Sequence, residues 1–428
     1  MGDSCGISGT VEPHGERASF HCNQPTSLKA IKFTKNSLNF TSNRLWQNTT
    51  NNNMNKEREK LTKTIVKGPF KGDHVGSFLR PERLKKARLQ KQTGKITAEQ
   101  LRAIEDEEII RLVEKQKEAG LEAVSDGELR RAWWHFDFLA ALDGVELYEA
   151  DSGIQFHGVQ TKPHGIKVTG KVDFTNHPMI EDYKFLHQIA GDHVAKFTIP
   201  SPNMLFFRGK IDEAVYPDKE VFFDDLIAAY QKAIQAFYDA GCRYLQLDDT
   251  SWAAFFSEKG REQMLEKGQD PEQIALLSAK AINESIAKKP ADMVITMHIC
   301  RGNFKSTYTA SGGYDSVSEV IFGGLNVDGL FLEFDDERSG GFEPLRHVNR
   351  ADLQIVLGLI TSKFGELENP ETIKTRIAEA SKYVSLEQLC LSPQCGFAST
   401  EEGNLLTEEQ QWEKVHHVVS IAKDVWKS

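Results

Sequence analysis

The heptapeptide Val294-Ile295-Thr296-Met297-His298-Ile299-Cys300 is an apolar run that ends in an imidazole and a thiol. The run has the pattern of a buried strand, and side chains along a strand alternate between its two faces. His298 and Cys300 are therefore expected on the same face at the end of this strand. One nitrogen and one sulfur in this arrangement would form half of a tetrahedral zinc site. The alternative is that both residues pack in a core strand, because free cysteine is among the most buried residue types.

Short apolar runs alternate with amphipathic helices on both sides of this stretch. Strands are expected near residues 73–77, 121–125, 195–200, 243–247, 294–299, 329–334, 354–360 and 387–392. Helices are expected near residues 97–120, 223–241, 271–288, 370–383 and 407–426, the first opening with a capping box at Thr97–Gln100. Eight strands in βα alternation predict an α/β fold, a closed (β/α)8 TIM barrel. An open doubly wound sheet is less favoured, because no glycine-rich phosphate loop follows the first strand.

Two regions depart from the βα alternation. The glycine-rich stretch near residues 150–190 predicts an inserted hairpin over the barrel mouth. Residues 1–60 are rich in Ser, Thr and Asn without a sustained period, which predicts a disordered N-terminal tail. Met54 is a plausible alternative start, and a transit peptide is the rival explanation for the extension. We thus expect an extension over 1–60 and a single barrel domain over 61–428.

The composition restricts the possible partners and location. Lys and Arg number 52 and Asp and Glu number 62, so the net charge is −10 and gives no support for nucleic-acid or anionic-membrane binding. No apolar run approaches the roughly 18 to 20 residues of a membrane helix, and the first residues lack a secretory signal. The six scattered cysteines do not indicate a disulfide scaffold, so we expect a reducing, cytoplasmic setting.

Polar residues at the ends of the expected strands are the candidates for chemistry, because barrel active sites lie at that face. Glu333 stands within the apolar run from Gly329 to Phe334, where a carboxylate is costly unless it is paired or bound to metal. A salt-bridged Glu at a loop start is the alternative. Together, Glu333, His298, Cys300 and Cys395 would supply one oxygen, one nitrogen and two sulfurs. This mixed donor set suits Zn²⁺.

An ordered set of short motifs carries a family resemblance. The motifs are Asp-His-Val-Gly-Ser at 73–77, Asp-Gly-Glu at 126–128, Leu-Gln-Leu-Asp at 245–248, His-Ile-Cys at 298–300, Leu-Glu at 332–333 and Ser-Pro-Gln-Cys-Gly at 392–396. Over about residues 65 to 425, the chain resembles the catalytic barrel of cobalamin-independent methionine synthase, and more closely its short single-barrel homologues. The resemblance implies that His298, Cys300, Glu333 and Cys395 hold zinc and that the sulfur of homocysteine binds there.

The resemblance also implies roles for residues around the metal. Glu128 and Asp248 would receive the amino group of homocysteine, and the Val75-Gly76-Ser77 turn its carboxylate. Two anions suit an ammonium group, and a Gly-Ser turn offers N–H groups and a hydroxyl to a carboxylate. A surface Glu beside Arg130 and Arg131 is the alternative for Glu128, and a helix N-cap is the alternative for Asp248.

The implied function is a zinc-dependent methyltransferase that forms methionine from homocysteine. A thiol with a pKa near 8.5 is mostly protonated at neutral pH, and coordination to zinc makes it a thiolate that attacks a methyl group. The expected donor is 5-methyltetrahydrofolate (as the polyglutamate) or a methylated corrinoid on a carrier protein. The alternatives are a zinc-dependent alkyltransferase acting on another thiol, a decarboxylase-like barrel, and a non-catalytic zinc-stabilised barrel, which would unfold when the metal is removed.

The folate side departs from the family pattern. The full-length family enzyme has a second, N-terminal barrel, for which we expect no room here. Lys363 stands where that enzyme has a histidine thought to protonate the leaving folate, so Lys363 and Asp248 are the candidate catalytic residues. Phe206 or Phe207 is the nearest candidate to stack on a pterin. The adjacent Trp133 and Trp134 either line a pocket or pack in the core.

Overall fold

The computed structural model describes residues 68–427. The predicted disordered tail over residues 1–60, together with Cys5 and Cys22, lies outside these residues. The division of the chain into a tail and one barrel domain therefore stays a prediction.

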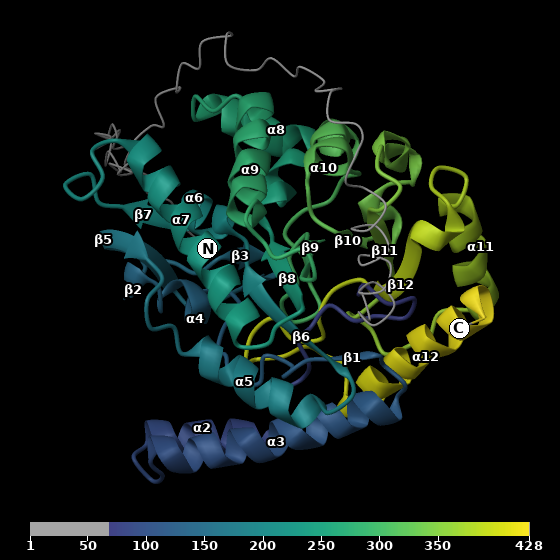
Figure 1. Cartoon of the computed structure of the whole chain (residues 1–428), viewed down its shortest axis with the longest axis horizontal. Helices are drawn as coiled ribbons and strands as arrows, with labels where there is room; N and C mark the ends of the chain where they lie inside the picture. Colours follow the sequence, from purple (N-terminus) through teal and green to yellow (C-terminus); the bar gives the residue numbers. More distant parts are fainter. Residues whose placement is uncertain (1–67, 428) are drawn as a thin grey trace, which may run out of the picture.

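A curled sheet of seven parallel strands forms the centre of the molecule (Figure 1). Its order is β1 (Ala123–Val124), β6 (Val194–Pro200), β8 (Tyr244–Asp249), β9 (Val294–Ile299), β10 (Gly329–Glu333), β11 (Gln354–Ile360) and β12 (Leu389–Pro393). Almost every residue of these strands is buried, as expected for parallel strands covered on both faces. All seven coincide with predicted strands to within about two residues.

The first predicted strand, over 73–77, forms no ladder and instead closes the ring between β12 and β1. Gly72 makes an isolated parallel bridge to Leu391, and on the other side the Phe78 N–H donates to the Gly127 carbonyl at 3.0 Å. The carbonyls of His74 and Val75 accept from the side chains of Lys196 and Gln246 rather than from neighbouring strands, so no regular pairing forms. The prediction of a TIM-like α/β barrel is confirmed.

Helices surround the sheet on its outer side (Figure 1). They are α2 (Glu82–Gln92), α3 (Ala98–Glu118), α4 (Phe136–Leu139), α5 (Met179–Ala190), α6 (Pro202–Arg208), α7 (Lys219–Asp239), α8 (Glu258–Glu266), α9 (Pro271–Ile286), α10 (Ser318–Gly324), α11 (Pro370–Ala380) and α12 (Glu408–Trp426). The capping box expected at Thr97 and Gln100 is present at the start of α3, with both reciprocal hydrogen bonds. No helix within residues 68–427 is long and apolar enough to span a membrane.

The insertion has different bounds from those predicted. It is an antiparallel pair of β2 (Asp143–Glu149) and β5 (His164–Asp173), to which β7 (Gly209–Ile211) adds in parallel. A small hairpin of β3 (Gln155–Phe156) and β4 (Val159–Gln160) lies inside it. The predicted range of 150–190 is therefore wrong at both ends. Residues 179–190 form barrel helix α5, which buries Met179, Tyr183 and Leu186 at helical spacing.

Candidate metal centre and its pocket

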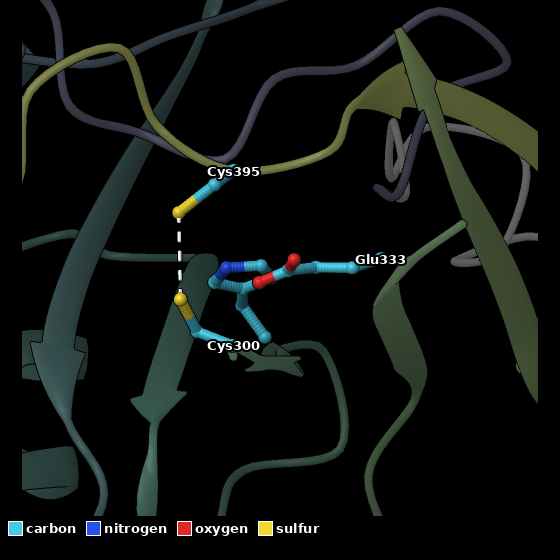
Figure 2. A group of neighbouring side chains, drawn as sticks. Cys300, Glu333 and Cys395 are labelled. Atoms are coloured by element: carbon cyan, nitrogen blue, oxygen red, sulfur yellow. Dashed lines mark hydrogen bonds between the residues drawn. The ribbon is translucent and has the colours of Figure 1, made fainter. Parts of the chain in front are cut away.

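Four side chains from three strand ends meet in one cluster (Figure 2). His298 lies on β9, Cys300 directly follows β9, Glu333 ends β10, and Cys395 comes two residues after β12. Their candidate ligand atoms all lie within 4.8 Å of one another, and all four residues are buried. The structure thus brings together the four residues for which the sequence predicted a shared metal site.

The two thiols of the cluster are spaced as zinc ligands would be. The Sγ atoms of Cys300 and Cys395 lie 3.6 Å apart and share a hydrogen bond (Figure 2). Two sulfurs bound to a tetrahedral zinc ion at about 2.3 Å each would lie ~3.8 Å apart. The hydrogen bond raises the pKa of Cys300 and lowers that of Cys395. A divalent cation bound to both sulfurs would allow both thiols to ionise.

The imidazole of His298 is oriented by its strand neighbour. Its Nδ1 lies 3.2 Å from the Phe331 carbonyl, so Nδ1 carries the proton and donates it there. Its Nε2 is buried without a hydrogen-bond partner. A carbonyl that fixes one ring nitrogen and leaves the other as a lone-pair donor is the usual arrangement of a metal-binding histidine.

The carboxylate of Glu333 is held ionised by positive charges. Its Oε1 accepts from the Arg301 backbone N–H at 2.6 Å, and its Oε2 accepts from the Arg338 guanidinium at 2.7 Å. Burial alone would raise the pKa of Glu333, but Lys363, Arg338 and Arg301 outweigh it and hold the pKa at about 2. Glu333 is therefore a permanent anion and a suitable oxygen ligand. The donor set as a whole fits zinc.

The two predicted ammonium-binding carboxylates line the same pocket as His298 and both thiols. Glu128 accepts from the Thr198 hydroxyl at 2.7 Å through Oε1, whereas its Oε2 has no partner. Asp248 accepts from Gln246 at 2.7 Å. Burial, together with the charge of Glu128, raises the pKa of Asp248 to about 7. A buried carboxyl whose pKa is raised by burial and by a neighbouring negative charge forms a favourable place for a cation.

The predicted carboxylate-binding turn lies on the wall of this pocket. Val75 and Ser77 line the pocket. Gly396 packs against Ser77 so closely that a Cβ added to Gly396 would lie 2.0 Å from the Ser77 hydroxyl oxygen. Gly76 has φ of +147°, and a Cβ there would lie 2.5 Å from the Thr198 methyl group. Gly76 is therefore required by both the backbone conformation and the space, although its own atoms do not line the pocket.

Lys363 does not lie where a proton donor to a bound substrate would be expected. Its side chain is buried, and its Nζ lies 3.9 Å from Asp335 Oδ2 with no hydrogen-bond partner. It is not among the pocket-lining residues within 68–427. Its positive charge favours the ionised forms of Glu333 and Asp335. A catalytic role for Lys363 stays a prediction, and its position favours electrostatic support of Glu333.

The aromatic wall of the pocket includes Trp133 and Trp134, for which pocket lining was one of two expectations, and residues that the sequence did not single out. Phe206 and Phe207, the residues expected to meet a pterin, are not among the described pocket-lining residues. The wall instead contains Trp133, Trp134, His135, Phe156 and Phe304. Phe156 belongs to the inserted hairpin, and its ring centroid lies 5.4 Å from that of Phe304. The run Trp133-Trp134-His135, soon after the second strand end, was the available signal.

The fold and the cluster together define a TIM-like barrel with a buried His/Cys/Glu/Cys group at its strand ends that could hold a metal ion. The family model of the cobalamin-independent synthase catalytic domain matches residues 70–424. The chain therefore belongs to the cobalamin-independent methionine synthase family and is a methyltransferase of this type. The family resemblance read from the motifs is confirmed.

Individual relatives agree with this assignment. The uncharacterized protein YxjG of Bacillus subtilis is 68% identical over 84% of this chain and 96% of its own length. A methionine synthase of Sulfurisphaera tokodaii is 23% identical over 82% of this chain and 91% of its own length. A solved structure from Listeria monocytogenes, described as a candidate vitamin-B12-independent methionine synthase, has 53% identity and a TM-score of 0.70. It covers 84% of this chain and 98% of its own.

Proposed function

We propose that this chain is a zinc-dependent methyltransferase that moves a methyl group to the thiolate of homocysteine and releases methionine. One observation supports the proposal above all others. Four buried ligand atoms within 4.8 Å of one another belong to residues of which three line a pocket shared with Ser77, Glu128 and Asp248. A site that binds both a sulfur and the two charged ends of an amino acid is what homocysteine requires.

The residues of the chain have distinct parts in this proposal. His298, Cys300, Glu333 and Cys395 would hold Zn²⁺, which when bound lowers the pKa of the substrate thiol so that a thiolate is present at neutral pH. Glu128 and Asp248 orient the substrate through its ammonium group, and the turn at Val75–Ser77 receives its carboxylate. The pocket then holds sulfur and methyl donor in line, which is catalysis by positioning.

The transfer itself is a substitution at carbon. A new bond forms between the homocysteine sulfur and the methyl carbon as the bond from this carbon to the donor breaks. The electron pair of the broken bond remains with the donor. With 5-methyltetrahydrofolate, the departing nitrogen also needs a proton. Asp248 lines the pocket and can donate it only from its neutral carboxyl form, in which case Glu128 alone supplies the negative charge for the ammonium group.

The identity of the donor is the open part of the proposal, and it can be tested directly. Zinc-loaded protein and homocysteine would be incubated separately with 5-methyltetrahydrofolate, methylcobalamin and S-methylmethionine, and the methionine formed would be measured. We expect methionine from the folate or the corrinoid. The matched Cys395→Ser variant should form none above the protein-free rate. If no donor yields methionine with the wild-type protein, the assignment of homocysteine as substrate is wrong.

A further inference from the structure

The pocket also contains a positively charged side chain, Arg208, that the proposed homocysteine site does not use. Arg208 ends α6 and lines the pocket together with Cys300 and Asp248. Within residues 68–427 its side chain makes a single hydrogen bond, from Nη2 to the Thr250 hydroxyl at 2.9 Å, and it forms no salt bridge with a carboxylate. Most of the donor capacity of this guanidinium is therefore left for a ligand.

Asp249 interacts electrostatically with Arg208 but forms neither a hydrogen bond nor a salt bridge with it. Asp249 Oδ2 accepts from Ser201 at 2.5 Å and Asn203 at 3.1 Å, and its Oδ1 accepts from the N–H and the hydroxyl of Ser251, both at 2.6 Å. These four hydrogen bonds occupy its lone pairs, so Asp249 holds the loop after β8 in place. Other arginines of the site behave differently, because Arg338 pairs with Glu333 and Arg131 with Glu128.

The imidazole of His135, also in the pocket, has no hydrogen-bond partner in the described part of the chain. His135 is only 2% exposed, lines the pocket, and neither of its ring nitrogens makes a hydrogen bond. Its ring packs against Trp134 and Phe136, with centroids 4.5 Å and 4.1 Å away. A buried polar group without a partner is costly, so such groups in native structures commonly mark a place where a ligand supplies the missing bond.

We propose that Arg208, with His135 and the Thr250 hydroxyl, forms a subsite for an anionic oxygen group of the methyl donor. This inference depends on the proposed function. The homocysteine side of the pocket carries carboxylates for an ammonium group, whereas this side carries N–H donors, and a guanidinium prefers carboxylate or phosphate oxygens. The anion has two possible sources, the carboxylates of a methylfolate and the phosphodiester of a methylcorrinoid.

The subsite can be tested by comparing donors with and without an anionic group. Zinc-loaded wild type, Arg208→Met and Arg208→Lys would receive homocysteine with 5-methyltetrahydrofolate, methylcobalamin or methyl iodide, which is small and uncharged. For the anionic donor that is used, we expect Arg208→Met to raise KM by at least about tenfold, since a charge-assisted hydrogen bond is lost. The rate ratio of this donor to methyl iodide should fall by a similar factor, and Arg208→Lys should recover part of it.

A binding measurement and a matched control complete the design. Inorganic phosphate should inhibit the wild type competitively against the anionic donor and inhibit Arg208→Met at least about tenfold more weakly. Arg346 is exposed and, among residues 68–427, its side chain hydrogen-bonds only the Glu343 carbonyl. It provides the control Arg346→Met, which should match the wild type. The donor arms show whether a folate or a corrinoid supplies the anion.

The outcomes separate the two proposals. A rise of KM for homocysteine instead of the donor, or an equal loss with all donors including methyl iodide, would overturn the subsite. The subsite would also be overturned if the wild type used methyl iodide but neither anionic donor and phosphate did not inhibit this reaction. Absence of methionine with every donor in the wild type would overturn the proposed function and the subsite with it.

Discussion

The two sides of the pocket are built in different ways. The candidate metal side stands on the ends of β9, β10 and β12, and its carboxylate is held by neighbours, because Glu333 accepts hydrogen bonds from Arg301 and Arg338. We call it the paired side after these hydrogen bonds, and the other side the unpaired side. The opposite side stands on loops, α6 and the inserted hairpin. It carries Arg208, which makes a single side-chain hydrogen bond among the described residues, and His135, whose ring nitrogens make none. The first side is preorganised for a metal ion, whereas the second has hydrogen-bonding capacity that a bound ligand would satisfy.

The largest expected effect comes from removing a thiol on the paired side. Cys395→Ser should abolish stoichiometric zinc binding and lower kcat by about 1000-fold, because several kcal/mol of metal assistance is lost. The barrel should remain folded, since Cys395 lies in a loop outside the strand core. Elemental analysis, methionine formation and circular dichroism would check the three parts. Unfolding of the variant, or of the chelated wild type, would instead support a zinc-stabilised structural barrel.

Glu128 tests whether the paired side also binds the amino acid. Glu128→Gln keeps the size of the side chain but removes the charge, so KM for homocysteine should rise by about 30- to 100-fold as the charge-assisted bond to the ammonium is lost. Zinc content should be unchanged. Glu114→Gln, on the exposed face of α3, is the matched control. A fall in kcat with KM unaltered would place Glu128 in the chemical step rather than in binding.

The sequence predicted the paired side far better than the unpaired side, for a physical reason. His298, Cys300, Glu333 and Cys395 could be found because parallel strand ends of a barrel converge at one face. Arg208 and His135 lie outside this regularity, because the direction of a loop side chain depends on tertiary packing. The prediction of a strand over residues 73–77 was wrong for a related reason. The side chains of Lys196 and Gln246 donate to backbone carbonyls there that would otherwise pair with a neighbouring strand.

Arg338 tests how much the supporting charges contribute on the metal side. Arg338→Met removes the donor to Glu333 Oε2 and the ion pair to Asp335, 3.0 Å away, so zinc affinity should fall by about 10- to 100-fold. Competition with a chromophoric chelator would measure the zinc affinity, with Arg346→Met as the control.

The variant Lys363→Met separates the catalytic and the electrostatic role of Lys363. A lower kcat at full zinc occupancy would support its catalytic role, whereas weaker zinc binding would support the electrostatic one.

The last expected effect concerns the segment that follows the insertion and depends on pH. His177 stacks on Phe174 just after β5, donates to the Phe138 carbonyl, and is buried, which lowers its pKa to about 4. As the pH falls below about 6.5, His177 binds a proton in the unfolded chain, whereas in the folded chain it does so only near pH 4. The free energy of unfolding therefore decreases over this interval, by roughly 3 kcal/mol at most. His177→Gln removes this titration. Its thermal midpoint should lie below that of the wild type at pH 8, and the difference should shrink toward pH 4.5. A constant difference across this range would show that His177 titrates normally in the folded chain and that this segment is not acid-sensitive through this residue.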